Sequence, residues 1–152
     1  MKTVVVVPTY NEAQNLPQIV AQVISLGVEG LEVLVVDDNS PDGTGRIAEE
    51  LASLYPGRLH VLHRERKMGL GPAYIRGFQE ALKMDADYII QMDADFSHPP
   101  SHIPLLLEKM EVCDLAIGSR YVKGGKVDER WSHWRRLLSF GGNLYARFFC
   151  YR

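Results

Sequence analysis

The sequence has few cysteines, no long apolar run and no large excess of charge of either sign. Two cysteines in 152 residues cannot supply a disulfide framework or a four-cysteine zinc site, and their scarcity favours a reducing compartment. The net charge is −2, from 17 lysines and arginines against 19 aspartates and glutamates, which argues against nucleic acid as a partner. No stretch reaches the roughly 18 apolar residues of a transmembrane helix, and no signal-peptide core is recognisable. We therefore expect a cytoplasmic protein.

What is present is a regular alternation of strand-like and helix-like segments. Hydrophobic residues make up 46% of the chain and charged residues 24%, as in an ordinary globular domain. Short apolar runs predict strands over residues 3–8, 32–36, 58–62, 88–92 and 115–119. Helical spacing predicts helices over residues 12–25, 44–54, 71–84 and 101–110, the last with Ser101 as its N-cap. Such βαβ units predict an α/β fold class: one domain over residues 1–152, with a mostly parallel central sheet and helices on both faces.

Polar and acidic residues follow the predicted strands at their carboxyl ends. The four segments are Pro8-Thr9-Tyr10-Asn11-Glu12, Asp37-Asp38, Asp93-Ala94-Asp95 and Ser119-Arg120-Tyr121. Ligands of parallel sheets bind beyond these ends, so the segments are expected to meet at one edge. Several carboxylates in one cleft repel one another unless a cation joins them. Oxygen ligands favour Mg²⁺ or Mn²⁺, which also bind substrate phosphates.

Each of these residues has a functional and a purely structural interpretation. Asp93 and Asp95 point to the same side of an extended segment and could meet one metal or diphosphate, or they could form an ordinary strand-ending turn. Asp38 could accept hydrogen bonds from a nucleotide base or ribose, or begin a turn. Tyr10 could stack on a base, or be an exposed loop aromatic. Arg120 suits a phosphate, or is a surface arginine.

The histidines are less informative. His98 and His102 stand four residues apart, a spacing that suits a metal on a helix. Pro99 and Pro100 prevent a continuous helix between them. We therefore expect no metal pair from these histidines.

Three other motifs fit the sequence less well. Residues 38–49 match a calcium-loop pattern, but a predicted strand precedes them where a helix is required. A glycine-rich dinucleotide motif is absent after the first strand, and Gly69-Leu70-Gly71 comes too late for it. Residues 35–39 and Met92-Asp93 resemble a phosphoacceptor receiver domain. No lysine follows Lys126, so the late lysine of receivers has no candidate, and this signalling alternative ranks low.

Five motifs in fixed order carry a family resemblance. They are Val-Val-Pro-Thr-Tyr-Asn-Glu (6–12), Val-Val-Asp-Asp-Asn-Ser-Pro-Asp-Gly-Thr (35–44), Gly-Leu-Gly-Pro-Ala-Tyr (69–74), Met-Asp-Ala-Asp-Phe-Ser-His-Pro-Pro (92–100) and Gly-Ser-Arg-Tyr-Val-Lys-Gly-Gly (118–125). The chain resembles family 2 glycosyltransferases, and more narrowly the dolichyl-phosphate (polyprenyl-phosphate) mannosyltransferases. The resemblance implies a Rossmann-like GT-A fold. It also implies inverting, metal-dependent transfer of a sugar, most often mannose from GDP-mannose, to dolichyl or polyprenyl phosphate.

The resemblance also implies roles for particular residues. The positions that hold the nucleotide sugar are Pro8, Tyr10, Glu12, Val36, Asp38, Asp93, Ala94, Asp95 and Arg120. Those that hold Mg²⁺ or Mn²⁺ are Asp93, Asp95 and Ser97, and those that meet the acceptor phosphate are Arg135 and Arg136. The catalytic positions are Asp95, Arg120 and Arg135. A metal aided by Arg120 would stabilise the departing diphosphate, and an acceptor phosphate that is already an anion needs no strong general base.

The last part of the chain suggests a membrane surface. Residues 130–150 mix aromatic and basic side chains, as at a lipid interface, although a helix packed on the core would show the same periodicity. We expect a peripheral protein at the cytoplasmic face of a membrane, with a membrane-anchoring partner subunit as a further expectation. Catalytic domains of the family continue beyond this point, so a truncated domain that binds nucleotide sugar without turnover is the alternative.

Overall fold

The computed structural model describes residues 1–119, 122 and 132–150. The chain divides into two compact units, Met1–Asp114 and Leu115–Arg152, and each is treated by itself. The first unit carries the sheet and the acidic strand ends. None of the helices in the described residues is long and apolar enough to span a bilayer.

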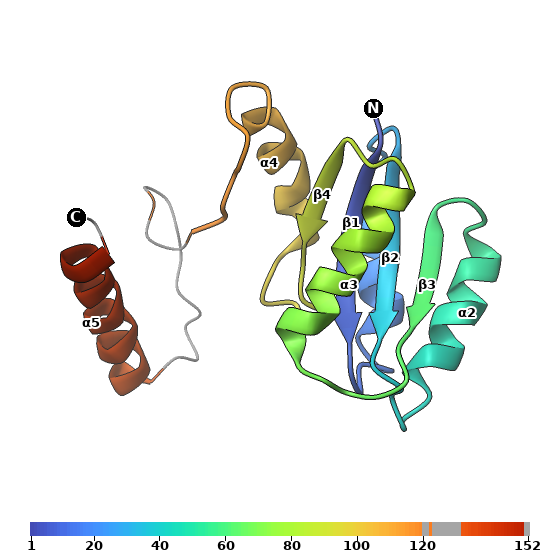
Figure 1. Ribbon diagram of the computed structural model, residues 1–152, viewed down its shortest axis with the longest axis horizontal. Helices are drawn as coiled ribbons and strands as arrows, with labels where there is room; N and C mark the ends of the chain where they lie inside the picture. Colours follow the sequence, from blue (N-terminus) through green and yellow to red (C-terminus); the bar gives the residue numbers. More distant parts are fainter. Residues whose placement is uncertain (120–121, 123–131, 151–152) are drawn as a thin grey trace. The chain divides into compact units, whose positions relative to one another are not determined.

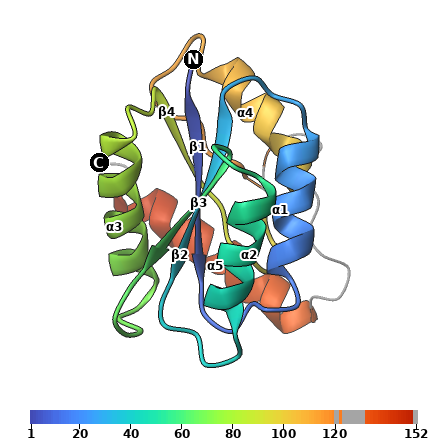
Figure 2. The same ribbon diagram turned by 90° about the vertical axis from the view of Figure 1, so that its right-hand side faces the viewer.

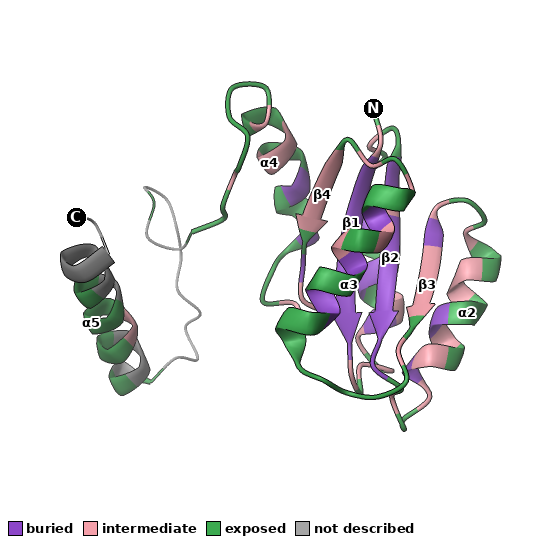
Figure 3. Cartoon of the chain, in the orientation of Figure 1, coloured by how far each residue is buried: buried purple, intermediate pink, exposed green. Residues whose placement is uncertain are grey.

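In the described residues, four parallel strands form one sheet in the order β3-β2-β1-β4 (Figure 1). They are β1 (Thr3–Thr9), β2 (Leu31–Asp37), β3 (Leu59–His63) and β4 (Tyr88–Gln91). Strand β1 lies in the interior, paired with β2 on one side and β4 on the other. Both β1 and β2 are apolar runs buried almost throughout (Figure 3), as parallel strands covered on both faces require. The predicted parallel sheet is confirmed.

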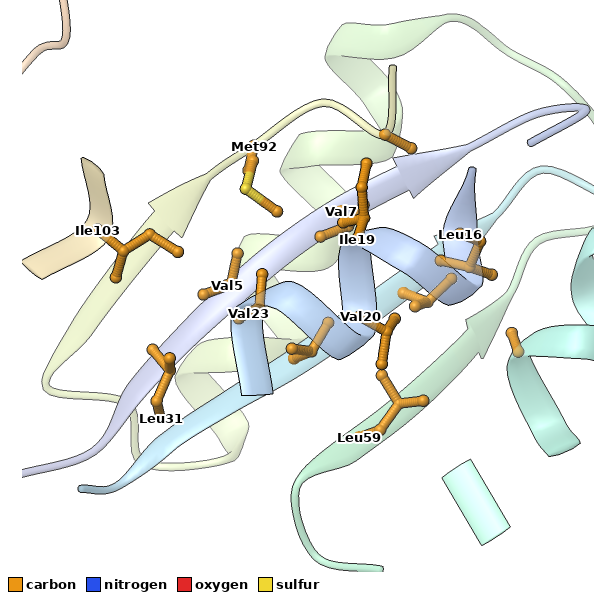
Figure 4. Close-up of a cluster of buried hydrophobic side chains, with 14 residues drawn as sticks. Val5, Val7, Leu16, Ile19, Val20, Val23, Leu31, Leu59, Met92 and Ile103 are labelled. Carbon is orange, nitrogen blue, oxygen red and sulfur yellow. The ribbon is translucent and has the colours of Figure 1, made fainter. Parts of the chain in front are cut away.

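Helices cover both faces of this sheet (Figure 2). They are α1 (Leu16–Ser25), α2 (Thr44–Leu54), α3 (Leu70–Lys83) and α4 (Ile103–Lys109), the last preceded by the 3-10 turn η1 (Pro100–His102). Because successive strand residues face opposite sides, Val5 and Val7 pack with α1 (Figure 4), whereas Val4 and Val6 pack with α3.

Helix α3 approaches the sheet most closely at Gly77. A Cβ built there would collide with Val6 Cγ1 and lie 3.1 Å from Val36 Cγ2. The helix axis can therefore lie this close to β1 and β2 only because residue 77 has no side chain. The close approach brings Tyr74, one turn earlier in α3, against the same face.

Two helices begin later in the structure than the sequence predicts. Helix α1 begins at Leu16 instead of residue 12, because the backbone amides of residues 11–13 donate to side chains of the next loop. Helix α4 begins at Ile103 with His102 as its N-cap, so Ser101 is not the cap. A proline in the first turn of α4 favours this start, since its φ angle is already helical and no amide is lost.

The predicted strand over residues 115–119 is wrong. These residues have no strand conformation, and Leu115 and Ile117 are 73% and 76% exposed. A strand exists only when a neighbour hydrogen-bonds to it, and within the described residues the sheet contains β1 to β4 alone. An apolar run of strand length is therefore not sufficient evidence for a strand.

The second unit contains helix α5 (His133–Cys150). Its exposed apolar side chains are Trp134, Leu137, Leu138, Phe140, Leu144 and Tyr145. Arg135 and Arg136 lie in α5, but their side chains fall outside the described ones. Arg120 lies outside the described residues altogether. The interpretations of residues 1–152 as one domain and of 130–150 as a lipid-interface segment stay predictions.

Candidate functional site

The carboxyl ends of β2, β1 and β4 place the predicted site residues side by side. The amide of Asp38 donates to the carbonyl of Thr9 (3.1 Å), and the amide of Met92 donates to that of Val6 (3.2 Å). The segments that follow β2 and β4 thus flank β1 at the same edge. Neighbouring strands are about 4.8 Å apart, so the backbones of the two segments are separated by about 10 Å. This span suits different parts of one extended ligand better than a single ion.

Asp37 and Asp38 have different tasks. Asp37 is 2% exposed and accepts hydrogen bonds from the hydroxyls of Thr9 (3.1 Å) and Ser40 (2.6 Å) and from the Ser40 amide (3.1 Å). These hydrogen-bond donors lie in β1 and the loop after β2, and His63 Nδ1 at the end of β3 lies 4.0 Å from Asp37 Oδ2. Asp37 therefore fixes the shape of that loop.

Asp38 instead holds the β3–α3 loop. Its Oδ1 accepts a hydrogen bond from Arg64 Nη1 at 2.7 Å, and its Oδ2 accepts one from the Met68 amide at 3.4 Å. The side chains of this ion pair are only 6% and 10% exposed. Since both carboxylate oxygens are engaged, Asp38 positions this loop.

The same loop reaches Tyr10. Lys67 Nζ lies 3.8 Å from the centroid of the Tyr10 ring, a cation–π contact. Asn39 Nδ2 also donates to the carbonyl of Glu65 (3.1 Å). The β3–α3 loop thus runs across the carboxyl edge of the sheet (Figure 1), and one face of the ring predicted to stack on a base carries a cation.

Asp93 follows β4 and is held from two sides. Tyr74 Oη donates a hydrogen bond to Asp93 Oδ1 at 2.6 Å. The backbone amide of Asp93 donates one to His98 Nδ1 at 3.1 Å. Burial raises the pKa of Tyr74, and the hydrogen bond to Asp93 with the charges of Asp93 and Asp95 raises it further. Tyr74 therefore remains a protonated donor. His98 Nδ1 also lies 3.9 Å from Asp93 Oδ2.

Asp95 is kept ionised by its own loop. The Ser97 hydroxyl holds the pKa of Asp95 below its ordinary value, assisted by the Ser97 amide, and together they outweigh the partial burial that acts in the opposite direction. The amide donates to Asp95 Oδ1 at 2.9 Å.

This donor set fits a divalent ion that completes its shell with phosphate and water. No group of three or more histidine, cysteine, aspartate or glutamate side chains in the described part of the chain could hold a metal ion. Mg²⁺ is commonly bound through only one or two carboxylates plus substrate phosphates. Asp93 and Asp95, with hard oxygen atoms at the ligand-binding edge, match that mode. Ser97 contributes to it by holding Asp95.

The other predicted nucleotide positions are buried or hold the loops of this edge. Pro8 and Val36 are buried within β1 and β2, and Ala94 is 4% exposed, so these three residues present little surface of their own. The Glu12 amide donates to Thr44 Oγ1 (2.9 Å) and its carboxylate accepts from Asn15 Nδ2 (2.8 Å). Glu12 therefore stabilises the entrance to α1.

Asp42 connects the first two loops of this edge. Its carboxylate accepts hydrogen bonds from the Ala13 amide (3.1 Å), the Thr44 amide (3.0 Å) and the Thr44 hydroxyl (2.6 Å). Desolvation acts to raise the pKa of Asp42, but these hydrogen bonds outweigh it and lower the pKa. The loops after β1 and β2 are thus held together as one rigid rim.

Sequence reasoning missed four residues of the site: Arg64, Lys67, Tyr74 and His98. Of these four, only Arg64 could have been predicted from the sequence. A carboxylate after a buried strand requires a hydrogen-bond donor, and an arginine directly after the next strand is well placed to supply it. The other contacts join residues that are distant in sequence or that form tight loops.

The family model of Glycosyl transferase family 2 matches residues 4–151. Polyprenol monophosphomannose synthase of Mycolicibacterium smegmatis is 50% identical over 149 residues, which cover 97% of this chain and 55% of the relative. Undecaprenyl-phosphate mannosyltransferase of Micrococcus luteus is 46% identical over 147 residues, covering 97% and 59%. The chain therefore spans about half the length of these curated relatives.

Solved structures with the same fold contain bound nucleotide sugars. A mannosyltransferase from Pyrobaculum calidifontis in complex with GDP-Man and Mn²⁺ is 28% identical, with a TM-score of 0.52 over 62% of this chain and 27% of that one. TarS of S. aureus in complex with UDP-GlcNAc is 25% identical, with a TM-score of 0.58 over 73% and 32%. This likeness confirms the predicted GT-A fold. Motifs, fold and family model agree, and the chain belongs to glycosyl transferase family 2.

Proposed function

We propose that the protein transfers a sugar, mannose from GDP-mannose, to a polyprenyl or dolichyl phosphate with inversion. The observation that carries this proposal is the pair Asp93 and Asp95 at the carboxyl end of β4, one held by Tyr74 and the other kept ionised by Ser97. The two relatives described above bear the names of enzymes that act with mannose and polyprenyl-type phosphates, and the Pyrobaculum structure contains GDP-Man and Mn²⁺.

Different residues of the carboxyl edge would bind different parts of the nucleotide sugar. Tyr10, Asp38 and the β3–α3 loop face the nucleoside, with Arg64 and Lys67 as the neighbouring cations. Asp93 and Asp95 would hold Mg²⁺ or Mn²⁺ against the diphosphate. When bound, the ion stabilises the negative charge that develops on the leaving nucleoside diphosphate. Because an acceptor phosphate is already ionised near neutral pH, its attack requires no general base from the protein.

The acceptor side of the site belongs to this proposal as well. Arg120 would face the donor phosphates, and Arg135 and Arg136 of α5 would meet the acceptor phosphate. We assign the protein to the cytoplasmic face of a membrane, as a peripheral protein with a membrane-anchoring partner subunit. The exposed apolar side chains of α5 support contact with a lipid interface.

Calorimetry with GDP tests the binding half of the proposal. We expect binding with Mn²⁺ and much weaker binding in a chelator, and we expect Asp95→Asn to remove the metal dependence without unfolding the protein. Asp114→Asn, an exposed aspartate away from this edge, is the matched control. Unchanged Mn²⁺-dependent affinity in Asp95→Asn would refute the metal assignment, and a parallel titration with UDP tests the choice of base.

A turnover assay with GDP-mannose and a polyprenyl phosphate tests the transfer half. The alternative is a nucleotide-sugar-binding domain that does not turn over. Formation of polyprenyl phosphomannose supports the enzyme. Mn²⁺-dependent GDP binding without product supports the alternative.

A further inference from the structure

An exposed surface beside the site combines basic and apolar side chains. It consists of Arg66, Lys67, Met68 and Leu70 of the β3–α3 loop and the start of α3, with Ile75 and Arg76 of α3, and we call it the α3 patch. Met68, Leu70 and Ile75 are 57%, 55% and 60% exposed. These values are high for three large apolar side chains on neighbouring turns, and such clusters mark interaction sites.

The helix geometry explains why the patch faces outward. Ala73, Tyr74, Gly77 and Ala81 of α3 pack against the sheet, so the residues half a turn away point to solvent. Figure 3 shows the outer side of α3 as exposed. Nothing in the fold of the first unit explains why residue 75 is an isoleucine and not a polar residue.

The patch also borders a cleft of suitable chemistry. A cleft of about 780 Å³ is lined by Arg66, Arg76 and His63 together with Met68 and Ile75. Its walls thus present cations next to apolar side chains. Glu65 is the acidic residue that lines it.

Two of the three arginines that line this cleft have no carboxylate partner in the described part of the chain. Arg64 is paired with Asp38, whereas in the described part of the chain Arg66 and Arg76 form no ion pair within 4.0 Å. The charge of Arg76 contributes to lowering the pKa of Glu80. A protein with a net charge of −2 therefore carries a local cationic surface.

We propose that the α3 patch binds the surface of an anionic lipid bilayer, with Arg66 and Arg76 on lipid phosphates and Met68, Leu70 and Ile75 in the headgroup region. Anionic bilayers bind surfaces on which basic side chains alternate with apolar ones. Nucleic acid fits less well, because the patch has no aromatic side chain on which a base could stack. The inference rests on the membrane contact of the proposed function and names a surface for it, but it requires neither nucleotide nor acceptor.

Co-sedimentation of the full chain with vesicles tests the electrostatic part. With about 30 mol% anionic lipid, we expect the double variant Arg66→Glu with Arg76→Glu to bind roughly tenfold more weakly than the parent. Arg46→Glu with Lys109→Glu makes the same change of charge at exposed positions on α2 and α4 and is the matched control. The parent is also expected to lose binding in high salt. Equal loss in both double variants, or none in either, overturns the proposal.

A second measurement reports on the patch alone, whatever α5 contributes to membrane binding. Tryptophan is placed at Ile75 or, as the control, at Leu54 of α2, which is 70% exposed. Brominated anionic lipid is expected to quench the added fluorescence at position 75 and not at position 54, after subtraction of the parent signal. Quenching at neither position overturns the proposal. So does a doubled mass in solution that Arg66→Glu with Arg76→Glu abolishes, because the patch would then bind a second copy of the chain.

Discussion

At the scale of single residues, the site depends on neutral donors that fix charged acceptors. Tyr74 is buried in the cluster between α3 and the sheet, with only its hydroxyl directed to Asp93. A phenol whose pKa is raised donates without competing for the proton. The carboxylate therefore keeps its charge and a fixed direction.

Replacing Tyr74 with phenylalanine is expected to destabilise the protein and to weaken metal-dependent GDP binding. The lost hydrogen bond has a charged acceptor, so we expect a decrease of about 1.5–3 kcal/mol in the free energy of unfolding. Partners that orient a metal ligand typically affect affinity by about tenfold or more. Urea denaturation and calorimetry measure the two effects. Tyr55→Phe, at a partly buried tyrosine of the other face, is the control, and an equal loss there would show that Tyr74 has no special role.

The pH dependence of Asp95 provides a second test at this scale. Its folded pKa is lowered from the ordinary value of 3.8, so the stability that it contributes is complete above that value and is lost as pH falls through the folded pKa. Ser97→Ala removes the hydroxyl and is expected to move the pKa upward, toward 3.8. Carbon-13 titration of the Asp95 carboxyl by NMR measures this shift.

The same variant separates two roles of Ser97. If Ser97 only holds Asp95, the Mn²⁺ affinity of Ser97→Ala at pH 7 falls by no more than about tenfold and the pKa of Asp95 rises, because the carboxylate is ionised in both proteins and loses only an orienting partner. A large loss of affinity at pH 7 with an unchanged Asp95 pKa would make Ser97 a direct ligand instead. Ser101→Ala, at an exposed serine of η1, is the control.

At the scale of elements, the packing of α3 decides where Tyr74 and the β3–α3 loop lie. Gly77→Ala would place a methyl group against Val6 and Val36. We expect a decrease of about 1–3 kcal/mol in the free energy of unfolding, since an extra methyl in a filled core forces side chains or backbone to shift. Thermal and urea denaturation measure it.

Gly71 provides the matched comparison on the same helix. A Cβ there meets no atom within 4 Å, so Gly71→Ala is expected to leave stability unchanged or to raise it by up to about 1 kcal/mol. If both alanine variants behaved alike, the close contact between α3 and the sheet would not be the cause of the Gly77 effect.

The elements also show what the sequence could predict. The valine-rich runs of β1 and β2 predicted a buried parallel sheet, and the spacing of Asp93 and Asp95 predicted a metal and diphosphate loop at its edge. These signals are local. The partners of the carboxylates are not, because Arg64 and Tyr74 reach Asp38 and Asp93 across 26 and 19 positions of sequence. Their contacts follow from the register of the strands and the depth of α3, which no local pattern encodes. The strand predicted over residues 115–119 failed for the same reason, since a strand requires a neighbour.

At the scale of the whole molecule, the loops at the carboxyl edge are held in different ways. Asp42 and Asp37 fix the loops after β1 and β2, whereas the β3–α3 loop is held chiefly through Arg64 and Lys67. A nucleotide that stacks on Tyr10 competes with Lys67 for the same ring. Binding is therefore expected to rearrange the β3–α3 loop and to leave the first two loops in place.

This coupling predicts a metal-dependent gain in thermal stability. A ligand at about 100 times its dissociation constant stabilises the folded state by about 2.7 kcal/mol, which for a chain of this size raises the midpoint of unfolding by about 5–10 °C. We expect this shift with GDP and Mn²⁺ together, and little with either alone, since Asp93 and Asp95 meet the diphosphate through the ion. Differential scanning calorimetry measures it, with Asp95→Asn as the negative control. Lys67→Ala frees the Tyr10 ring, so it is expected to keep the shift. A shift that GDP produces equally in a chelator would place the diphosphate away from the β4 loop.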